Sequence, residues 1–520
     1  MTTQPDPRRW WALAALGTCM LVIGFDLTIL NVALPEMAGQ LDAGTGEMQW
    51  IVDAYIVVFA ATMLPAGLLG DRFGRRRMLI AGLVVFLAGS LMGALVEEPG
   101  WIITARTFMG LGAALITPLA LSVLPSLFED EKERTKAIGI ITATVAGGMP
   151  LGPIVGGWLL DHFWWGSVFL VNIPLAALGI LVCLLLLPES RDVSSPHVDA
   201  VSAVLSVTGL GSLVFGIIEG PSRGWSDPLV LGAFAASPAL LAALVLRERR
   251  LERPMLDLGL LARPAFRWNA LAATLITLVL AGLLFILPQY LQAVLGLDAF
   301  ATGVRLLPLM AGLLIAARAA GPLAARFGPR LPVAGGLVVL AFAAFLGART
   351  DVGDGYALTA TWLTVTGFGV GFAMVPAMDG ALAALPASHA GSGSGLLMTV
   401  RQTGAAIGIA LLGSLLSGTY TEKLDLDGLP HAAAEAAGDS VIAAHAVAEQ
   451  LGSGALAASA DAAFIDGMTR VLTVCGVGAL AAALLVAGLL PDPRRKEEQA
   501  EPVESAAGEE DTGPLSLPGT

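Results

Sequence analysis

The stretch GLLGDRFGRRRML, residues 67–79, joins two long apolar segments through one short, charged turn. Residues 54–70 and 78–96 contain no charged side chain, and each segment is long enough to cross a bilayer as a helix. Four arginines stand in the turn: Arg72, Arg75, Arg76 and Arg77. Clustered arginines keep a loop on the cytoplasmic side, so the stretch predicts both a membrane protein and the direction of these two spans.

The composition of the 520-residue chain leads to the same class. Apolar residues make up 56% of the chain, charged residues make up 14%, and the mean hydropathy is +0.77. A soluble globular protein carries about 25% charged residues, so the composition predicts an all-α polytopic membrane protein. The first apolar segment follows Arg8 and Arg9 and is too long for a cleavable signal peptide, so we interpret it as the first span.

We expect fourteen transmembrane spans, and their even number places both termini on one side. Most of the 29 basic residues lie on the side of the first turn, whereas the opposite loops hold Arg223, Arg349 and Lys423. This bias predicts a bacterial cytoplasmic (inner) membrane protein with both termini in the cytoplasm. The net charge of −13 comes largely from the C-terminal tail and a late loop, and it gives no reason to expect a nucleic-acid partner.

A second copy of the charged turn appears 254 positions later, where residues 321–330 align with residues 67–76. The copies follow the second and the tenth expected spans, so two additional spans separate two six-helix bundles. Parallel repeats of this kind are a known transporter construction, with the substrate bound between the halves. The predicted division is a cytoplasmic N-terminus 1–10, an N-terminal six-helix bundle 11–195, two additional spans 196–250, C-terminal spans nine to thirteen 251–417, an extracytoplasmic loop 418–467, span fourteen 468–490 and an acidic cytoplasmic tail 491–520.

Glycine and proline are concentrated in the fifth span, which contains GGMPLGPIVGG at residues 147–157. Small residues let helices approach closely, and proline removes a backbone hydrogen bond. We interpret the stretch as a hinge or gating face, with ordinary helix packing as the alternative. Its candidate residues are Gly148, Gly152, Pro153, Gly156 and Gly157. The first turn adds the gating candidates Gly67, Asp71, Arg72, Gly74, Arg75 and Arg76; in the second copy Ala325 replaces Asp71.

These motifs resemble the major facilitator superfamily, and specifically its fourteen-span drug:proton antiporters of the EmrB/QacA type. The similarity is carried by the first turn, the glycine-rich fifth span, and residues 25–35, 103–113, 287–292 and 395–404. It covers about residues 10–490 and implies the major facilitator fold. The family usually has an arginine between two aromatic residues after the fifth span, and residues 163–169 (FWWGSVF) lack it. The role of that arginine is therefore in doubt here.

Asp26 and Arg106 are charged residues in otherwise apolar spans. A charge at the bilayer centre costs at least about 2.5–3.5 kcal/mol on insertion scales, so such residues are functional by default. We interpret Asp26 as a reversible proton carrier, a role that the resemblance also implies. Arg106 cannot release its own proton, and we expect it to tune Asp26 by pairing with it or separating from it. The alternative for Asp26 is a structural ion pair or a helix–helix hydrogen bond, and the alternative for Arg106 is a fixed salt bridge.

Other polar and aromatic residues are candidates for substrate contact or gating. Asp53, one turn into the second span, is either an anionic contact for a cationic substrate or an interfacial acid. The candidate apolar lining of a substrate site comprises Phe285, Tyr290, Phe372 and Met378, with core packing as the alternative. Asp379 and Arg401 are expected near the cytoplasmic ends of spans twelve and thirteen, where pairing would close the inner mouth of the second half.

The favoured function is proton-coupled efflux of lipophilic, often cationic, compounds by alternating access, carried out by a monomer in the lipid bilayer. The chain has no GxxxxGK[ST] phosphate-binding sequence, so we expect the proton gradient to drive it, with no cofactor. The spacing of cysteines and histidines indicates no metal site, and no span carries a catalytic set, so we expect no enzyme. The alternatives are a dedicated exporter of an endogenous antibiotic or other metabolite, and a non-transporting sensor or scaffold.

Overall fold

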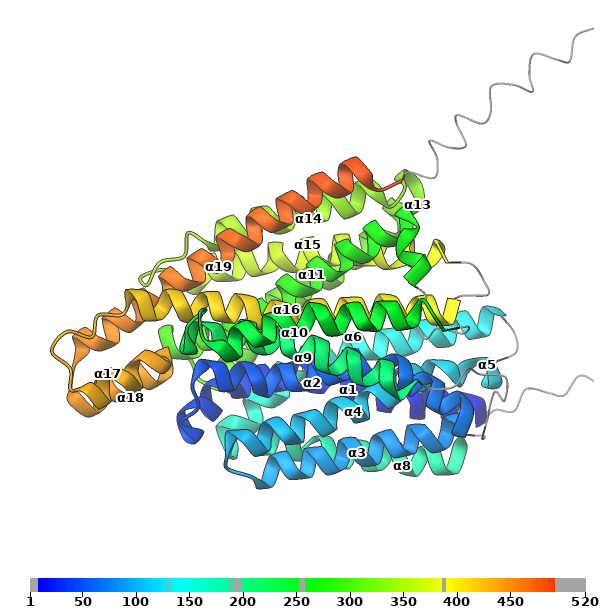
Figure 1. Cartoon of the computed structure of the whole chain (residues 1–520), viewed down its shortest axis with the longest axis horizontal. Helices are drawn as coiled ribbons and strands as arrows, with labels where there is room; N and C mark the ends of the chain where they lie inside the picture. Colours follow the sequence, from blue (N-terminus) through cyan, green and yellow to red (C-terminus); the bar gives the residue numbers. More distant parts are fainter. Residues whose placement is uncertain are drawn as a thin grey trace, which may run out of the picture.

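The computed structural model is a bundle of long helices that run side by side along one axis (Figure 1). It describes residues 8–128, 131–187, 189, 199–251, 258–385 and 390–491. All secondary structure in these ranges is helical, and they contain no strand. The predicted all-α class is therefore confirmed. Most of the predicted N-terminal segment 1–10 and of the acidic tail 491–520 lies outside the described residues.

The N-terminal half comprises eight helices that pack mainly on one another. They are α1 (Arg8–Leu41), α2 (Thr45–Phe73), α3 (Arg75–Leu95), α4 (Pro99–Ser122), α5 (Leu124–Leu127), α6 (Glu131–His162), α7 (Ser167–Leu170) and α8 (Asn172–Leu186). The charged turn separates α2 from α3 at Gly74, whose φ of 110° is accessible to glycine without steric cost. Pro99 begins α4, where its missing N–H needs no partner.

The C-terminal half follows the same plan after two additional helices. Its elements are η1 (Leu258–Ala262), α11 (Pro264–Gln289), η2 (Tyr290–Val294), α12 (Ala299–Arg305), α13 (Leu307–Phe327), α14 (Arg330–Gly347), α15 (Tyr356–Ala383), α16 (Ala390–Lys423), α17 (His431–Asp439), α18 (Val441–Leu451) and α19 (Gly454–Leu489). Gly328, which aligns with Gly74, separates α13 from α14 and has a φ of 79°. The repeated sequence therefore forms the same glycine turn in each half.

Twelve helical segments of the described chain are long and apolar enough to cross a membrane. They establish a multi-pass membrane protein, and the expected number of fourteen spans is not confirmed. The two long helices that are not among the twelve are α2 and α6, with 29 and 32 residues.

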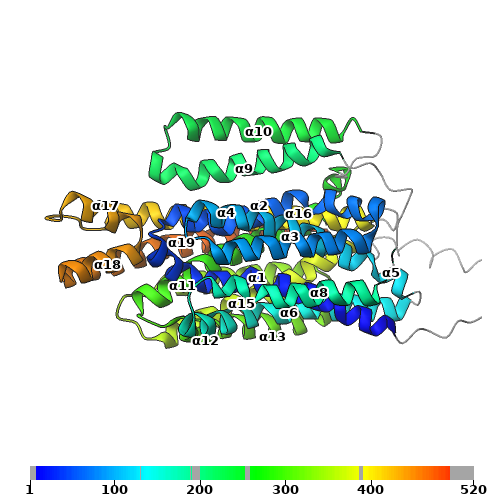
Figure 2. The same ribbon diagram turned by 90° about the horizontal axis from the view of Figure 1, so that it is seen from below.

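Helices α9 (Ala200–Arg223) and α10 (Pro228–Glu248) form a hairpin along one side of the bundle (Figure 2). Helix α9 contacts α2 and α16, one helix from each half, whereas α10 packs on α9. Pro221 of α9 has no N–H to donate to the carbonyl of Ile217, and Ser414 Oγ of α16 donates to that oxygen at 2.7 Å. A proline in α9 thus creates an acceptor that anchors the hairpin to the C-terminal half.

The predicted loop 418–467 is shorter than expected and largely helical. Helix α16 continues to Lys423 and α19 begins at Gly454, so the connection consists mainly of α17 and α18, called here the α17–α18 hairpin. Ser440 and Ser453 cap α18 and α19 with their side-chain oxygens, which explains why helices begin at these points. The alanine-rich sequence between the caps favours helix over open loop.

Candidate functional site

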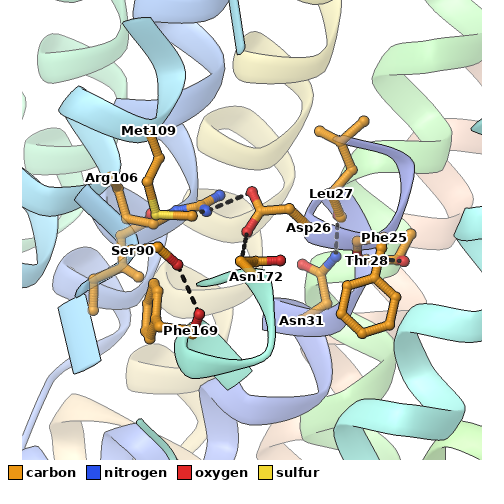
Figure 3. Close-up of polar contacts among 11 residues, drawn as sticks. Phe25, Asp26, Leu27, Thr28, Asn31, Ser90, Arg106, Met109, Phe169 and Asn172 are labelled. Atoms are coloured by element: carbon orange, nitrogen blue, oxygen red, sulfur yellow. Dashed lines mark hydrogen bonds and ion pairs between the residues drawn. The ribbon is translucent and has the colours of Figure 1, made fainter. Parts of the chain in front are cut away.

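Asp26 of α1 and Arg106 of α4 form an ion pair inside the N-terminal half (Figure 3). Arg106 Nη1 donates to Asp26 Oδ2 at 2.8 Å, and each side chain is 2% exposed. The hypothesis that the two residues pair is therefore realised in this conformation. Desolvating two charges is costly, so such a pair is stable only when other groups satisfy its remaining hydrogen-bonding atoms.

Besides Met109, whose sulfur lies 4.0 Å from Arg106 Nη1, three further residues contact this pair. Arg106 Nε donates to the backbone carbonyl of Ile51 at 3.2 Å, and its guanidinium carbon lies 4.3 Å from the centroid of the Tyr55 ring. Asn172, at the start of α8, donates from Nδ2 to Asp26 Oδ1 at 3.0 Å. Each carboxylate oxygen of Asp26 therefore accepts one hydrogen bond.

Close helix packing brings these side chains together. A Cβ at Gly110 would lie 2.5 Å from the Tyr55 carbonyl oxygen, so only glycine lets α4 approach α2 this closely. Ser90 Oγ of α3 donates to the Phe169 carbonyl at 2.7 Å and ties α7, which precedes Asn172, to the bundle. Arg106 is seven residues from the start of α4, about 10 Å along the helix.

Asp53 of α2 is 0% exposed, and neither of its carboxylate oxygens has a hydrogen-bond partner. It is therefore not the interfacial acid that was the alternative interpretation. A charged carboxylate without partners is costly in such surroundings, so this conformation suits an uncharged Asp53. Two acids of the same half thus differ sharply in their contacts.

The residues of the first turn contact the end of α8. Arg76 Nη2 donates to the Leu184 carbonyl at 2.6 Å, and Arg77 lies 3.4 Å from Glu189. The Arg72 guanidinium lies over the ring of Phe73, and Arg75 begins α3. A Cβ at Gly67 would make an ordinary contact of 3.6 Å with Pro118. The side chain of Asp71 lies outside the described residues.

The glycine-rich stretch of α6 faces two neighbours. Gly148, Gly152 and Gly156 pack against α1, where an added Cβ would meet backbone or side-chain atoms at 3.0 Å or less. Gly157 and Pro153 instead face α12 of the C-terminal half: a Cβ at Gly157 would lie 2.4 Å from the Ala299 carbonyl oxygen. Three glycines therefore serve helix packing within one half, and two residues lie where the halves meet.

The halves contact each other at the end of the bundle that carries the α17–α18 hairpin. Among described side chains, three donate hydrogen bonds from one half to the other: Thr45 to Asp439 O at 2.8 Å, Gln292 to Val32 O at 2.8 Å, and Gln49 to Ile409 O and Ala410 O at 3.4 Å each. At the opposite end, the C-terminal half has a separate apolar cluster around Phe266 and Leu397. This conformation is closed at the hairpin end.

The candidate lining residues of the C-terminal half are unequally exposed. Phe285 and Tyr290 are 0% exposed and belong to the core, so in this conformation they line no open site. Phe372 is partly exposed and stacks on Phe368, with ring centroids 5.6 Å apart. Met378 Sδ lies 4.0 Å from Arg401 Nη1.

The expected pair of Asp379 and Arg401 is not formed in this conformation. No ion pair among the described residues joins them; Asp379 is exposed, and Arg401 Nε is buried without a hydrogen-bond partner. Arg401 of α16 instead contacts Met378 of α15, the residue that precedes Asp379.

Sequence reasoning missed Asn172 and Tyr55. A single amide in an apolar span, followed by Pro174, was a usable signal for Asn172, whereas nothing in the sequence links Tyr55 to Arg106. It also missed that Cys19 of α1 and Cys183 of α8 lie together, with their sulfur atoms 3.9 Å apart and both thiols free.

A multi-pass helical bundle built from two repeated halves, with a buried ion pair in one of them, defines a class of membrane transport proteins. The chain belongs to the Major Facilitator Superfamily, whose sequence profile matches residues 16–409. The multidrug efflux pump LfrA of Mycolicibacterium smegmatis is 35% identical over 491 residues, covering 93% of this chain and 97% of that protein.

Two relatives from Streptomyces species are similarly close. The puromycin resistance protein pur8 of Streptomyces alboniger is 34% identical over 428 residues, which cover 81% of this chain and 84% of the relative. The tetracenomycin C resistance and export protein of Streptomyces glaucescens is 30% identical over 514 residues, covering 96% and 95%. Among solved structures, a bacterial homologue of the human lysosomal transporter Spinster, inward-facing and unoccupied, matches with a TM-score of 0.67, 20% identity and coverage of 94% and 98%. This match shows the fold.

Proposed function

We propose that this protein exports lipophilic, often cationic, small molecules across a bacterial cytoplasmic membrane in exchange for protons. The observation that carries the proposal is the buried pair of Asp26 and Arg106 in an apolar bundle. A scaffold or sensor has no use for a pair that is costly to insert, whereas an antiporter needs a buried acid that can exchange a proton. The names of the relatives, which include a multidrug efflux pump, support the substrate class.

The contacts of Asp26 suggest how proton release is linked to conformation. With the hairpin end closed, Arg106 and Asn172 stabilise the charged carboxylate, so the proton leaves towards the opposite end. Opening of the hairpin end would separate Arg106 from Asp26 and allow protonation from outside. An inside-negative potential contributes about 2.3 kcal/mol per charge per 100 mV to the return of that proton.

The proposed topology has fourteen spans, both termini in the cytoplasm and the α17–α18 hairpin outside. The helices α2 and α6 supply the two spans beyond the twelve, because α2 carries one charged residue, Asp53, between Met48 and Gly70, and α6 carries none between Ala137 and Leu160. The α9–α10 hairpin is then the pair of additional spans between two six-helix bundles. We propose a monomer, driven by the proton gradient without a cofactor.

Substrate contact and gating are assigned to residues of both halves. Asp53, Phe372 and Met378 are proposed to contact the cationic and apolar parts of the substrate. Pro153 and Gly157 are proposed to belong to the closing face, since they pack against α12. A second candidate function is export of one endogenous antibiotic, which is favoured by relatives named for resistance to puromycin and to tetracenomycin C.

The test uses the purified full-length protein in liposomes with an imposed pH gradient, with internal pH and a panel of fluorescent lipophilic cations followed together. We expect cation movement with matching proton flux, and loss of both in Asp26→Asn. Thr18→Ala is the matched control, because Thr18 is a half-buried residue of the same helix whose hydroxyl donates to Ala14 O within that helix. Transport that persists unchanged in Asp26→Asn would contradict the assigned carrier, and movement of no cation would favour the antibiotic exporter.

A further inference from the structure

Asn172 is the first residue of α8 and is 0% exposed. Its Nδ2 donates to Asp26 Oδ1 at 3.0 Å, while its own Oδ1 is buried without a hydrogen-bond partner (Figure 3). A buried amide that leaves its oxygen unsatisfied loses free energy, so its one contact must matter for something beyond packing.

The backbone explains why Asn172 lies at this point. The span that contains it is divided into α7 and α8, and Pro174 has no N–H to donate to the Leu170 carbonyl. The division places the start of α8, and with it the Asn172 side chain, next to Asp26. Interrupted spans present their helix ends to charged groups in this way in other transporters.

Both oxygens of Asp26 are occupied in this conformation. Arg106 Nη1 holds Oδ2 and Asn172 Nδ2 holds Oδ1, and both of these groups are donors. Protonation of the carboxyl group would remove its negative charge and so weaken both of these hydrogen bonds. The two contacts together favour the carboxylate over the protonated acid.

We propose that Asn172 is a positioning residue for Asp26, whose amide makes the carboxyl group release its proton when the hairpin end is closed. The proposal rests on the proposed role of Asp26 as the proton carrier. The titratable groups that face Asp26 are Arg106 from α4 and Tyr55 from α2. Among the residues of α6 whose side chains the structure describes, Gly148 and Gly152 pack on α1 beside it and carry no charge.

The experiment measures the protonation of Asp26 directly, in the full-length protein reconstituted in lipid. The infrared C=O stretch of protonated carboxyl groups is followed as a function of pH, and the part of the band that disappears in Asp26→Asn is assigned to Asp26. In Asn172→Ala the midpoint of that band should move about one unit towards higher pH, a tenfold rise in proton affinity, because one hydrogen bond to the charged form is lost. Asn172→Ser keeps a donor and should move the midpoint less.

The matched control is Ser90→Ala. It removes the hydrogen bond that ties α7 to α3 in the same helical unit, but Ser90 does not touch Asp26. We expect its midpoint to equal that of the wild type. An Asp26 band with the same midpoint in both Asn172 variants, an equal shift in Ser90→Ala, or the absence of an Asp26 band over the whole titration would each overturn the proposal.

The same samples separate this inference from the proposed function. A shifted Asp26 midpoint in Asn172→Ala supports the role of Asn172 even where liposomes show no gradient-driven cation transport. That combination of results would contradict the antiport proposal and leave the role of Asn172 supported. Conversely, antiport that depends on Asp26 with an unmoved midpoint would overturn the role of Asn172 and leave the proposed function standing.

Discussion

The two halves have the same arrangement of helices and differ in the partners of one arginine in each half. In the N-terminal half, Arg106 meets Asp26 at 2.8 Å, and Asn172 completes the contact. In the C-terminal half, Arg401 Nη1 lies 4.0 Å from the sulfur of Met378, no ion pair joins Arg401 to an acid among the described residues, and Asp379 is exposed. The repeated turns at Gly74 and Gly328 nevertheless have the same left-handed backbone. The two halves thus share a fold, but the buried ion pair of Asp26 and Arg106 is present in the N-terminal half.

This difference in ion pairing suggests different functional roles for the two halves. A complete ion pair can be exchanged for a protonated acid and a displaced arginine, so it can report a conformational change as a change in proton binding. An arginine without an acidic partner, such as Arg401, cannot be linked to proton binding in this way. The N-terminal half is therefore the place to look for proton coupling, and the C-terminal half for closure and substrate contact.

The largest expected effect comes from breaking the complete pair. Asp26→Asn leaves Arg106 buried without its counter-charge, which should lower the free energy of unfolding by about 3–5 kcal/mol. Adding Arg106→Gln should recover much of that loss, since the stranded charge is gone. Thermal unfolding in detergent of wild type, both single variants and the double variant measures this. A double variant as unstable as the sum of the single variants would mean that the two residues do not act as a pair.

A smaller effect is expected from the unmatched arginine. Arg401→Gln removes a charge that has no acidic partner among the described residues, so the free energy of unfolding should change by about 1 kcal/mol or less. The same thermal measurement applies, with Arg106→Gln as the comparison. A loss for Arg401→Gln as large as that for Arg106→Gln would indicate a counter-charge for Arg401 and would remove the contrast between the halves.

The smallest effect concerns the ion pair that the C-terminal half forms outside the proposed spans. The hydrogen bond from His445 to Asp461, 2.8 Å long, raises the pKa of His445, and burial opposes this in part. A raised folded pKa means that the stabilisation is fully present below the unfolded value of about 6.5 and is lost as the pH rises through the folded pKa. The rate of backbone hydrogen exchange in α18 should therefore increase as the pH rises from about 6.5 through the folded pKa of His445.

The control for this prediction is a second histidine of the same segment. His431 of α17 is 96% exposed and lies 3.7 Å from Glu435, so His431→Gln should leave the exchange of α18 unchanged. His445→Gln should remove the pH dependence. Equal pH dependence in His445→Gln would show that another group holds the α17–α18 hairpin on α19.

Much of the fold follows from local chemistry in the sequence. Charge-free segments and the arginines of the first turn indicate spans and their direction, and the aligned turns at residues 67–76 and 321–330 indicate two halves. The alanine-rich composition of residues 418–467 is compatible with short surface helices, and the serine caps at Ser440 and Ser453 mark where α18 and α19 begin. For the site, the cost of burying charge was enough to single out Asp26 and Arg106.

The sequence by itself determined the membrane class, the repeated plan and the candidate charges, because each depends on residue type and spacing along one helix. Tertiary structure alone decided which charges meet. Asp26 is satisfied and Asp53 is not, although both are acids in apolar spans, because only Asp26 lies where α4 and the start of α8 converge. That convergence depends on close approaches such as Gly110 against the Tyr55 carbonyl, which involve residues far apart in the chain.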